Sequence, residues 1–323
     1  MKSEHGGDLT IVIPVFRAEY LHDALRSLSA QSCRDFCLLV ADDASPDDIA
    51  SVIQAEGEEL TLRYVRFDDN LGSRELTAHW DRAVRIVETS WVLLMGDDDE
   101  LDPDLVACFY RALEQAGDGF DLYHFNTRRI DGAGAVRLVN TDHPPVESSL
   151  QFLSGRFRGE RSPYTCAYIF RRSAWERIGG FVSFPLAWCS DDATWVALGD
   201  QKGICTVAGP RASWRLSGRN ISSVRPEIAL QKLRAQSAYL SWLAEQHLGT
   251  SDWAPGPTIP QRLRGEAANW FHVGLWRSGC YVPVGAAMVM AQEVDRFTRL
   301  GVLYHLARVF RHNLDWLKKR HRG

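Results

Sequence analysis

The sequence lacks several features that would assign it to common classes of protein. It has no run of about 18 apolar residues, so no segment is expected to span a membrane. Its opening, MKSEHGGDLT, has no hydrophobic core of a secretory signal peptide. The seven cysteines form no C-x-x-C pair, which argues against a zinc site or a disulfide framework. The net charge of −4 gives no electrostatic basis for binding nucleic acid. These absences predict a reduced, cytoplasmic protein.

Short apolar, β-branched runs alternate with amphipathic segments through the first 126 residues. The apolar runs predict buried strands at 9–16, 36–41, 62–67, 91–95 and 121–126. The segments between them predict helices at 21–31, 47–57 and 73–88, and a further helix is opened by Asp102 and Pro103. Strands that alternate with helices through short loops indicate an α/β fold with a mainly parallel sheet flanked by helices.

The pattern changes further along the chain. The sequence then predicts a hairpin or loop, a helix, a strand and a second helix, at 127–145, 147–154, 164–171 and 191–200. From about residue 225 it reads as consecutive amphipathic helices, interrupted by the Pro- and Gly-rich segment 249–260. We therefore predict an α/β domain at 1–222 and a helical C-terminal region at 223–323.

Two clusters of carboxylates follow predicted strands. Asp42 and Asp43 come after the second strand, and Asp97, Asp98 and Asp99 end an apolar run in LLMGDDDELDP after the fourth. The carboxyl ends of parallel strands lie along one edge of a sheet, where open α/β folds bind ligands. Adjacent carboxylates repel one another and are ligands that Mg2+ or Mn2+ prefers. The pattern predicts a divalent-cation site, although aspartates at strand ends also cap helices or solvate turns.

Glycine-rich phosphate-binding loops are missing as well. Neither G-x-G-x-x-G after the first strand nor a Walker A pattern occurs. A phosphate-bearing ligand would lack a cradle of backbone amides and would depend on a bound cation instead. We predict that the three aspartates hold a divalent ion and that this ion holds a diphosphate.

Five motifs in order resemble those of the family 2 glycosyltransferases, which have the GT-A fold. They are TIVIPVFRAEYLHDALRSLSAQS, VADDASPD, NLGS followed by HWDRAV, LLMGDDDELDPDL, and IGGFVSFPLAWCSDDATW. The resemblance covers roughly residues 9–222 and implies a Rossmann-like, mainly parallel sheet. It also implies transfer of a sugar from a nucleotide diphosphate donor with the help of Mn2+ or Mg2+.

The resemblance assigns roles to residues at the donor site. Asp43 is expected to accept a hydrogen bond from the nucleobase imide, and Asp42 is expected to support it. The backbone after the first strand is expected to line the base pocket, and a basic residue to contact the nucleotide. The donor-binding residues implied in this part of the chain are Pro14, Val15, Phe16, Glu19, Asp42, Asp43 and Arg74.

The resemblance also orders the three aspartates. Alignment with the family's Asp-x-Asp region places Gly96 where many members have the first aspartate. Asp98 then corresponds to the principal metal-binding aspartate, with Asp97 and Asp99 beside it, and Asp97 is also expected to contact the donor. The departure at Gly96 leaves open which carboxylates touch the metal.

The segment CSDDATW supplies a candidate catalytic base. Alignment of Trp195 with the aromatic residue of the family's acidic motif makes Asp191 the catalytic aspartate, with Asp192 as the alternative. An inverting transfer needs a carboxylate to remove the proton of the acceptor hydroxyl while that oxygen attacks the anomeric carbon. A structural role also fits, because Ser190 followed by two acids is typical of a helix N-terminus.

Two basic segments remain. In SWRLSGRNISS (213–223), Arg215 or Arg219 is expected to contact the donor diphosphate, although a polar surface turn is an equally good interpretation. Residues 308–323 interleave six basic side chains with apolar ones. Such a segment can lie on an anionic membrane surface, or it can dock on its own domain or on a second subunit.

Together these patterns predict an inverting, metal-dependent glycosyltransferase. It is expected to move a sugar from a UDP-based donor to a hydroxyl of a glycan or lipid-linked acceptor in surface polysaccharide assembly. The predicted location is the cytoplasm or the inner face of the membrane, with a homo-oligomer left open. One rival is a nucleotidyltransferase on a related fold, disfavoured because PVFRAEY lacks a glycine-rich loop. The other is a non-catalytic sugar-nucleotide-binding protein, disfavoured by CSDDATW.

Overall fold

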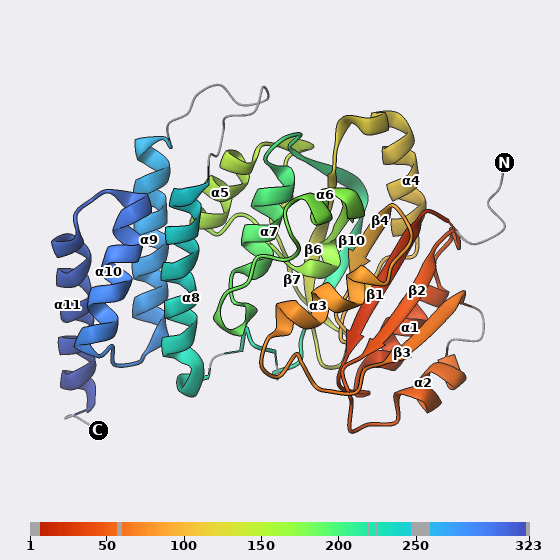
Figure 1. The fold of residues 1–323 in the computed structure, drawn as a ribbon, viewed down its shortest axis with the longest axis horizontal. Helices are drawn as coiled ribbons and strands as arrows, with labels where there is room; N and C mark the ends of the chain where they lie inside the picture. The colour runs from red at the N-terminus through yellow and green to blue at the C-terminus, as the bar shows by residue number, and fades with distance from the viewer. Residues whose placement is uncertain (1–6, 57–59, 219, 224, 247–258, 321–323) are drawn as a thin grey trace.

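The computed structural model describes residues 7–56, 60–218, 220–223, 225–246 and 259–320 of the chain. Within these residues a mixed β-sheet with flanking helices forms one part, and four consecutive helices stand side by side at the far end of the molecule (Figure 1). Among the described helices none is long and apolar enough to cross a membrane.

The sheet has the strand order β3-β2-β1-β4-β9-β6-β10-β5, with β7 paired to β6 and β8 to β10. The strands are β1 (Leu9–Val15), β2 (Cys37–Asp42), β3 (Leu62–Arg66), β4 (Trp91–Leu94), β5 (Glu100–Leu101), β6 (Leu122–Asp131), β7 (Val136–Val139), β8 (Val146–Glu147), β9 (Tyr168–Arg171) and β10 (Ile204–Leu216). Strands β3, β2, β1 and β4 are parallel neighbours, as are β6 and β10, whereas β9 runs antiparallel between β4 and β6. The predicted α/β class, with a mostly parallel central sheet, is confirmed.

Helices follow most of these strands. In the sheet region they are α1 (Leu21–Ser29), α2 (Ile49–Glu56), α3 (Leu76–Arg85), α4 (Leu105–Ala116), α5 (Ser149–Arg158), α6 (Arg172–Arg177) and α7 (Ser190–Gly199). Single 3-10 turns are η1 (Gly117–Gly119), η2 (Thr165–Ala167) and η3 (Pro185–Ala187). The central strands are buried because their side chains are apolar on both faces, as in β4, where all four residues are buried.

Four helices make up the C-terminal part: α8 (Pro226–Glu245), α9 (Gln261–Ser278), α10 (Val284–Thr298) and α11 (Val302–Arg320). They pack against the sheet region through aromatic and polar contacts. Phe184, before α7, lies edge-to-face with Tyr239 of α8, with 5.9 Å between ring centroids. Ser154 of α5 donates a hydrogen bond to Glu266 of α9 at 2.6 Å. The division of the chain near residue 222 stays a prediction.

Strand β10 is the main departure from the sequence prediction. A polar loop is predicted at 213–223, but Ser213–Leu216 continue a strand that pairs with β6. Gly209 and Pro210 interrupt the strand pattern, and the pairing register shifts between Val207 and Arg211. The hairpin predicted within 127–145 is confirmed, because β6 turns back as β7.

Candidate functional site

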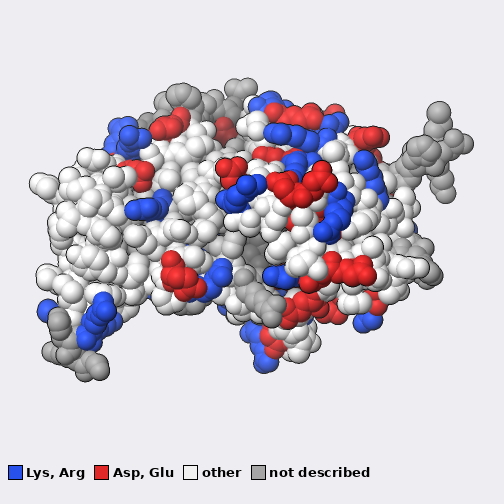
Figure 2. Space-filling model, turned by 60° about the horizontal axis from the view of Figure 1, so that its bottom comes forward, with Lys and Arg blue, Asp and Glu red and all other residues white. Residues whose placement is uncertain are grey.

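The acidic clusters meet at one edge of the sheet. Because β1 lies between β2 and β4, the loops after these three parallel strands leave the sheet at the same edge. Asp97, after β4, accepts hydrogen bonds from the backbone amides of Phe16 and Arg17, after β1, at 3.2 and 3.3 Å. Figure 2 turns the bottom of Figure 1, where these strands end, toward the viewer and shows acidic side chains beside a hollow.

Asp43 is buried at the end of β2 and holds the NLGS loop in place. Its Oδ1 accepts a hydrogen bond from the amide of Leu71 at 3.0 Å, and its Oδ2 accepts one from the amide of Gly72 at 2.8 Å. Arg82 of α3 donates to Oδ1 at 2.5 Å, and Nδ1 of His79 lies 3.2 Å from the same oxygen. The candidate nucleobase carboxylate is therefore positioned by two loop amides and an arginine.

Asp42 supports the turn that carries Asp43. Its carboxylate accepts hydrogen bonds from the amide of Ser45 at 2.7 Å, the hydroxyl of Tyr64 at 2.6 Å and the guanidinium of Arg66 at 2.6 Å. With its carboxylate fully buried and bonded on both oxygens, Asp42 has a structural position behind Asp43.

The basic residue beside Asp43 is Arg82, which the sequence prediction missed. Arg74, the predicted nucleotide contact, is 69% exposed and pairs with Asp69 at 3.0 Å. Helical spacing offered a signal, because His79 and Arg82 are three residues apart on α3 and so lie on one side of it. Only the tertiary structure turns that side toward Asp43.

The end of β1 has the position expected for a base pocket. The carbonyl of Val15 accepts a hydrogen bond from the amide of Asp43 at 2.9 Å, which joins the ends of β1 and β2. Pro14 and Phe16 are half-buried, and Glu19 is exposed in the loop before α1. Of these residues Val15 contacts Asp43 directly, and the contact of all four with a nucleobase stays a prediction.

The three adjacent aspartates bind three different parts of the protein. Asp97 accepts from the amides after β1, Asp98 accepts from the side-chain amide of Asn220 at 3.1 Å, and Asp99 accepts from the amide of Arg215 at 3.0 Å. Burial raises the pKa of Asp97 to about 7, and the charge of Asp98 adds to the rise. The same two causes raise the pKa of Asp99 well above its usual range. A nearby cation would stabilise three negative charges here.

The space beside Gly96 is already taken by two of these carboxylates. A Cβ atom at Gly96 would lie 2.9 Å from Oδ2 of Asp99 and 3.0 Å from Oδ1 of Asp98. The correspondence of Gly96 to the family's first aspartate stays a prediction, but the following carboxylates do fold back over the backbone of this loop. This contact gives a steric reason for a glycine at this position.

The donor set fits a divalent ion that is also held by a ligand. Among the residues that the structure describes, no group of three His, Cys, Asp or Glu side chains forms a ready-made metal cluster. Mg2+ in nucleotide enzymes commonly uses only one or two carboxylates together with waters and substrate phosphates. Asp98, with Asp97 beside it, supplies hard oxygen donors whose mutual repulsion a cation would relieve. These two residues would hold the ion.

Arg215 has a different role from the one predicted. Its side chain is fully buried, and its five N–H groups all have protein acceptors, which are the carbonyls of Asp98, Asp131 and Gly132 and the carboxylates of Asp23 and Glu100. The predicted contact with a diphosphate is corrected, because no N–H of this guanidinium is left for one in this arrangement. Arg215 instead stabilises the loop that carries Asp98 by donating a hydrogen bond to the carbonyl of Asp98. Arg219, the alternative, lies outside the described residues.

Asp191 and Asp192 open helix α7 in different environments. Asp192 is buried and pairs with Arg156 of α5, whose Nε donates at 2.6 Å. Asp191 is only partly buried and accepts a hydrogen bond from the amide of Asp192 at 2.9 Å. Burial raises the pKa of Asp191 to about 8, and the charge of Asp192 is the second cause. An accessible carboxylate with a raised pKa suits a general base better than one held in an ion pair.

The backbone before α7 is strained. Leu186, Ala187 and Cys189 all have positive φ angles, of 61°, 53° and 68°, which non-glycine residues rarely adopt. Ser190 does not cap α7 as predicted, because Cys189 occupies the N-cap position and the Ser190 hydroxyl accepts from the amide of Phe184 at 3.1 Å. Strain of this kind is found where surrounding structure fixes a functional residue.

The raised pKa of Asp191 predicts how stability changes with pH. The folded value is about 8, against about 3.9 for an unfolded chain, so between these values the folded chain holds the extra proton. The stability contributed by neutral Asp191 is present below about pH 4 and is lost as the pH rises through about 8. When urea unfolding is measured at several pH values in this range, the free energy of unfolding should fall less steeply with pH for Asp191→Asn than for the unmodified chain. The same pH dependence in both proteins would contradict the raised pKa of Asp191.

One segment joins α7 to the acidic loop. Burial raises the pKa of the Cys166 thiol, and the negative charge of Asp99 is the second cause. Two residues on, the ring of Tyr168 stacks on Trp195 of α7 with 4.4 Å between centroids, and the indole of Trp195 donates to the carbonyl of Pro163 at 2.8 Å. Trp195 is thus a core residue, and the segment between Pro163 and Tyr168 fixes α7 beside the aspartates.

Lys232 of α8 lies near the start of α7, and the sequence analysis did not predict this position. Its ammonium group lies 4.5 Å from the ring centroid of Trp188, just before Cys189, and donates to the carbonyl of Ser223 at 2.8 Å. The buried indole N–H of Trp188 has no acceptor among the described residues. Lys232 lies on a helix of a different region, so no local motif links it to Trp188.

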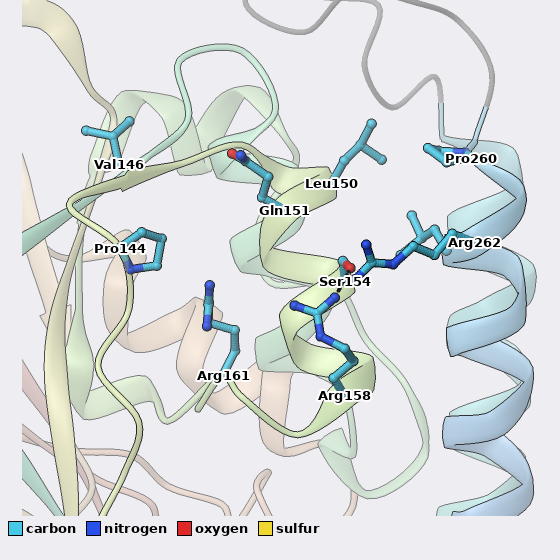
Figure 3. A pocket seen from close by; sticks show the side chains of 10 residues that line it. Pro144, Val146, Leu150, Gln151, Ser154, Arg158, Arg161, Pro260 and Arg262 are labelled. Atoms are coloured by element: carbon cyan, nitrogen blue, oxygen red, sulfur yellow. Dashed lines mark hydrogen bonds between the residues drawn. The ribbon is translucent and has the colours of Figure 1, made fainter.

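A separate pocket of about 460 Å³ lies between α5 and the start of α9 (Figure 3). None of the predicted site residues lines it. Its three arginines are each paired with a glutamate: Arg158 with Glu160, Arg161 with Glu147, and Arg262 with Glu266. The positive charges of the three arginines that line the pocket are therefore each balanced by a neighbouring glutamate.

Comparison with known proteins gives a family match and one curated relative. A family model described as Glycosyl transferase family 2 matches residues 10–178, more than half of the chain. Succinoglycan biosynthesis protein ExoW of Rhizobium meliloti (strain 1021) is 28% identical over 156 residues, which cover 43% of this chain and 47% of the relative. The match thus spans about half the length of that relative.

Solved structures share the fold at low sequence identity. Residues 1–349 of S. aureus TarS in complex with UDP-GlcNAc match with a TM-score of 0.70 and 15% identity, over 98% of this chain and 92% of that one. The mannosyltransferase PcManGT from Pyrobaculum calidifontis, in complex with GDP-Man and Mn2+, matches with a TM-score of 0.54 and 16% identity, over 96% and 88%.

Proposed function

The chain belongs to glycosyl transferase family 2, and from that premise we propose that it transfers a sugar from a UDP-sugar to a hydroxyl of a glycan or lipid-linked acceptor. The observation that carries the proposal is the meeting of the three-aspartate loop with the carboxyl end of β1. UDP-GlcNAc and GDP-Man in the titles of two similar structures support a nucleotide-sugar donor. The name of ExoW supports a role in polysaccharide assembly.

Asp191 is the proposed general base. It takes the proton of the acceptor hydroxyl as that oxygen bonds to the anomeric carbon, while the bond from this carbon to the diphosphate oxygen breaks and the nucleotide leaves with its electron pair. Attack from the face opposite the leaving group inverts the configuration. Asp192 keeps Arg156 paired and so holds the N-terminus of α7 against α5.

Asp98 and Asp97 are the proposed holders of Mn2+ or Mg2+, and Asp99 positions the loop through the amide of Arg215. When bound, such an ion offsets the negative charge that develops on a leaving diphosphate. Arg215 holds the carbonyl of Asp98 at 2.8 Å, so it fixes the direction of the loop without touching the donor.

Asp43 is the proposed nucleobase contact. A carboxylate offers about four acceptor sites. Oδ1 of Asp43 already accepts from Leu71 and Arg82, and Oδ2 accepts from Gly72, so the proposed imide N–H would take the remaining site on Oδ2. Uracil carries such an imide, which favours a UDP-sugar.

A nucleotide screen by thermal unfolding tests this assignment. UDP with Mn2+ is expected to raise the melting temperature more than GDP or CDP, because a ligand at about 100 times its Kd adds about 2.7 kcal/mol to the stability of the folded state. UMP is the matched control, since it keeps the base but lacks the diphosphate. Equal shifts with UMP and UDP would argue against a metal-bridged diphosphate, and no shift with any nucleotide would argue against the donor site.

A further inference from the structure

Helix α11 exposes an apolar stripe to solvent. Leu303, Phe310, Leu314 and Leu317 are 81%, 43%, 57% and 39% exposed. Their spacing of seven, four and three residues places them on one side of the helix. A different side of α11 packs on the bundle and is buried, including His305, Val309, His312 and Asn313. The stripe is therefore not needed to hold α11 on its own domain.

Apolar side chains extend beyond the stripe onto α9. A groove of about 590 Å³ between α9 and α11 is lined by Trp276, Leu300 and Tyr304, among others. Trp276 is 68% exposed, and the ammonium group of Lys319 lies 5.7 Å from the centroid of its ring. We call the stripe and these residues the α11 face. Exposed apolar surface of this extent marks an interaction site.

Positive charge accompanies the α11 face. Within α11 five basic residues stand against the single acid Asp315, and they are Arg308, Arg311, Lys318, Lys319 and Arg320. Figure 2 shows the end of the molecule formed by the C-terminal helices with wide uncharged areas and a cluster of basic side chains at its lower corner. Two of these residues, Arg308 and Arg311, line the groove between α9 and α11, so basic side chains lie within the α11 face as well as beside it.

We propose that the α11 face docks on a membrane surface that contains anionic phospholipids. A helix with an apolar stripe and basic flanks lies in the plane of the interface, with its apolar side chains among the acyl chains and its basic ones at the headgroups. An amphipathic aromatic residue such as Trp276 suits the boundary between the two. Docking through this end leaves the acidic edge, at the bottom of Figure 1, uncovered.

A second copy of the chain fits the α11 face less well. Two identical copies related by a two-fold axis present the same patch to each other. In an antiparallel α11 pair, the flank with Arg308, Arg311 and Lys318 would meet the same flank of the partner, and like charges in an interface are unfavourable. An anionic bilayer supplies the opposite charge along the whole flank.

Sedimentation of the full chain with lipid vesicles tests the proposal. Vesicles of phosphatidylcholine mixed with phosphatidylglycerol should carry the chain down, whereas vesicles of phosphatidylcholine alone should not. Lys318→Gln with Lys319→Gln should lower the partition coefficient about 25-fold, because each basic residue near an anionic surface contributes about 1 kcal/mol. The charge-matched control, Arg63→Gln with Arg85→Gln, changes exposed residues on β3 and α3 and should bind as the unmodified chain does.

A second variant isolates the apolar stripe. Phe310→Ser with Leu314→Ser keeps the net charge and should reduce vesicle binding at least ten-fold, since each buried CH2 contributes about 0.8 kcal/mol. Unfolding curves confirm that the variants fold. Failure to bind anionic vesicles would overturn the proposal. The proposal would also be overturned if light scattering showed that the unmodified chain is a dimer and that the variant with both serines is a monomer. That result would assign the α11 face to a second copy of the chain.

Discussion

Replacing Asp191 by Asn is expected to lower the rate of sugar transfer by about 10²- to 10⁴-fold, the usual contribution of a positioned general base. Asparagine keeps the size of the side chain but cannot take a proton from the acceptor hydroxyl. The affinity for UDP should stay nearly unchanged, because the donor contacts proposed above come from the loops after β1, β2 and β4. Product formation under saturating donor and calorimetric titration with UDP measure the two quantities separately.

Asp192→Asn is the matched control for this prediction. Asp192 lies next to Asp191 but is buried in an ion pair with Arg156, so its replacement removes the charged partner of a half-buried guanidinium. A loss of about 2 kcal/mol in the free energy of unfolding is expected. Transfer per folded molecule should fall less than in Asp191→Asn. If transfer per folded molecule fell more in Asp192→Asn than in Asp191→Asn, Asp192 would be the base.

Asp98→Asn is expected to remove the metal dependence of donor binding. In the unmodified chain, Mn2+ should strengthen UDP binding by about 100-fold or more, since a metal contact with a phosphate oxygen is worth several kcal/mol. The carboxamide introduced by this substitution can still accept a hydrogen bond from Asn220 but is a weaker ligand for a hard cation. The ratio of UDP affinities with Mn2+ and with EDTA should therefore approach one. Calorimetry under both conditions measures this ratio.

An exposed acid six residues further along the chain provides the control for Asp98→Asn. Asp104, at the start of α4, is exposed, so Asp104→Asn removes one negative charge from the same region without touching the proposed metal site. It should keep the full metal dependence. If Asp98→Asn also keeps it, the principal ligand is Asp97 or Asp99, and the alignment that shifts the motif past Gly96 is wrong.

The resemblance of five motifs predicted the family, whereas the apolar runs predicted the fold and the shared sheet edge of the acidic clusters for physical reasons. Buried parallel strands are read from continuous apolar runs, and β1, β2 and β4 each carry one. Parallel neighbours must release their carboxyl ends at one edge, which brings Asp97 to the amide of Phe16. Both steps depend on local pattern and topology alone.

Tertiary packing decided what the sequence could not predict. Whether Arg215 faces a ligand or the core depends on β6 and on the loop after β4, which come much earlier in the chain. A polar turn is one of the two interpretations predicted for 213–223, but the strand that carries Arg215 continues to Leu216. The choice between Arg74 and Arg82 likewise depended on which side of α3 faces Asp43. Cytoplasmic location and oligomeric state stay predictions.

Aspartates at the sheet edge are proposed to share a divalent ion with the diphosphate of UDP. Electron paramagnetic resonance of Mn2+ tests it directly, because the signal of the free aquo ion falls when the ion is bound. Protein and UDP together are expected to remove far more free Mn2+ than the sum of what each removes alone. A loss of signal equal to that sum would show that the protein and the nucleotide do not share the ion.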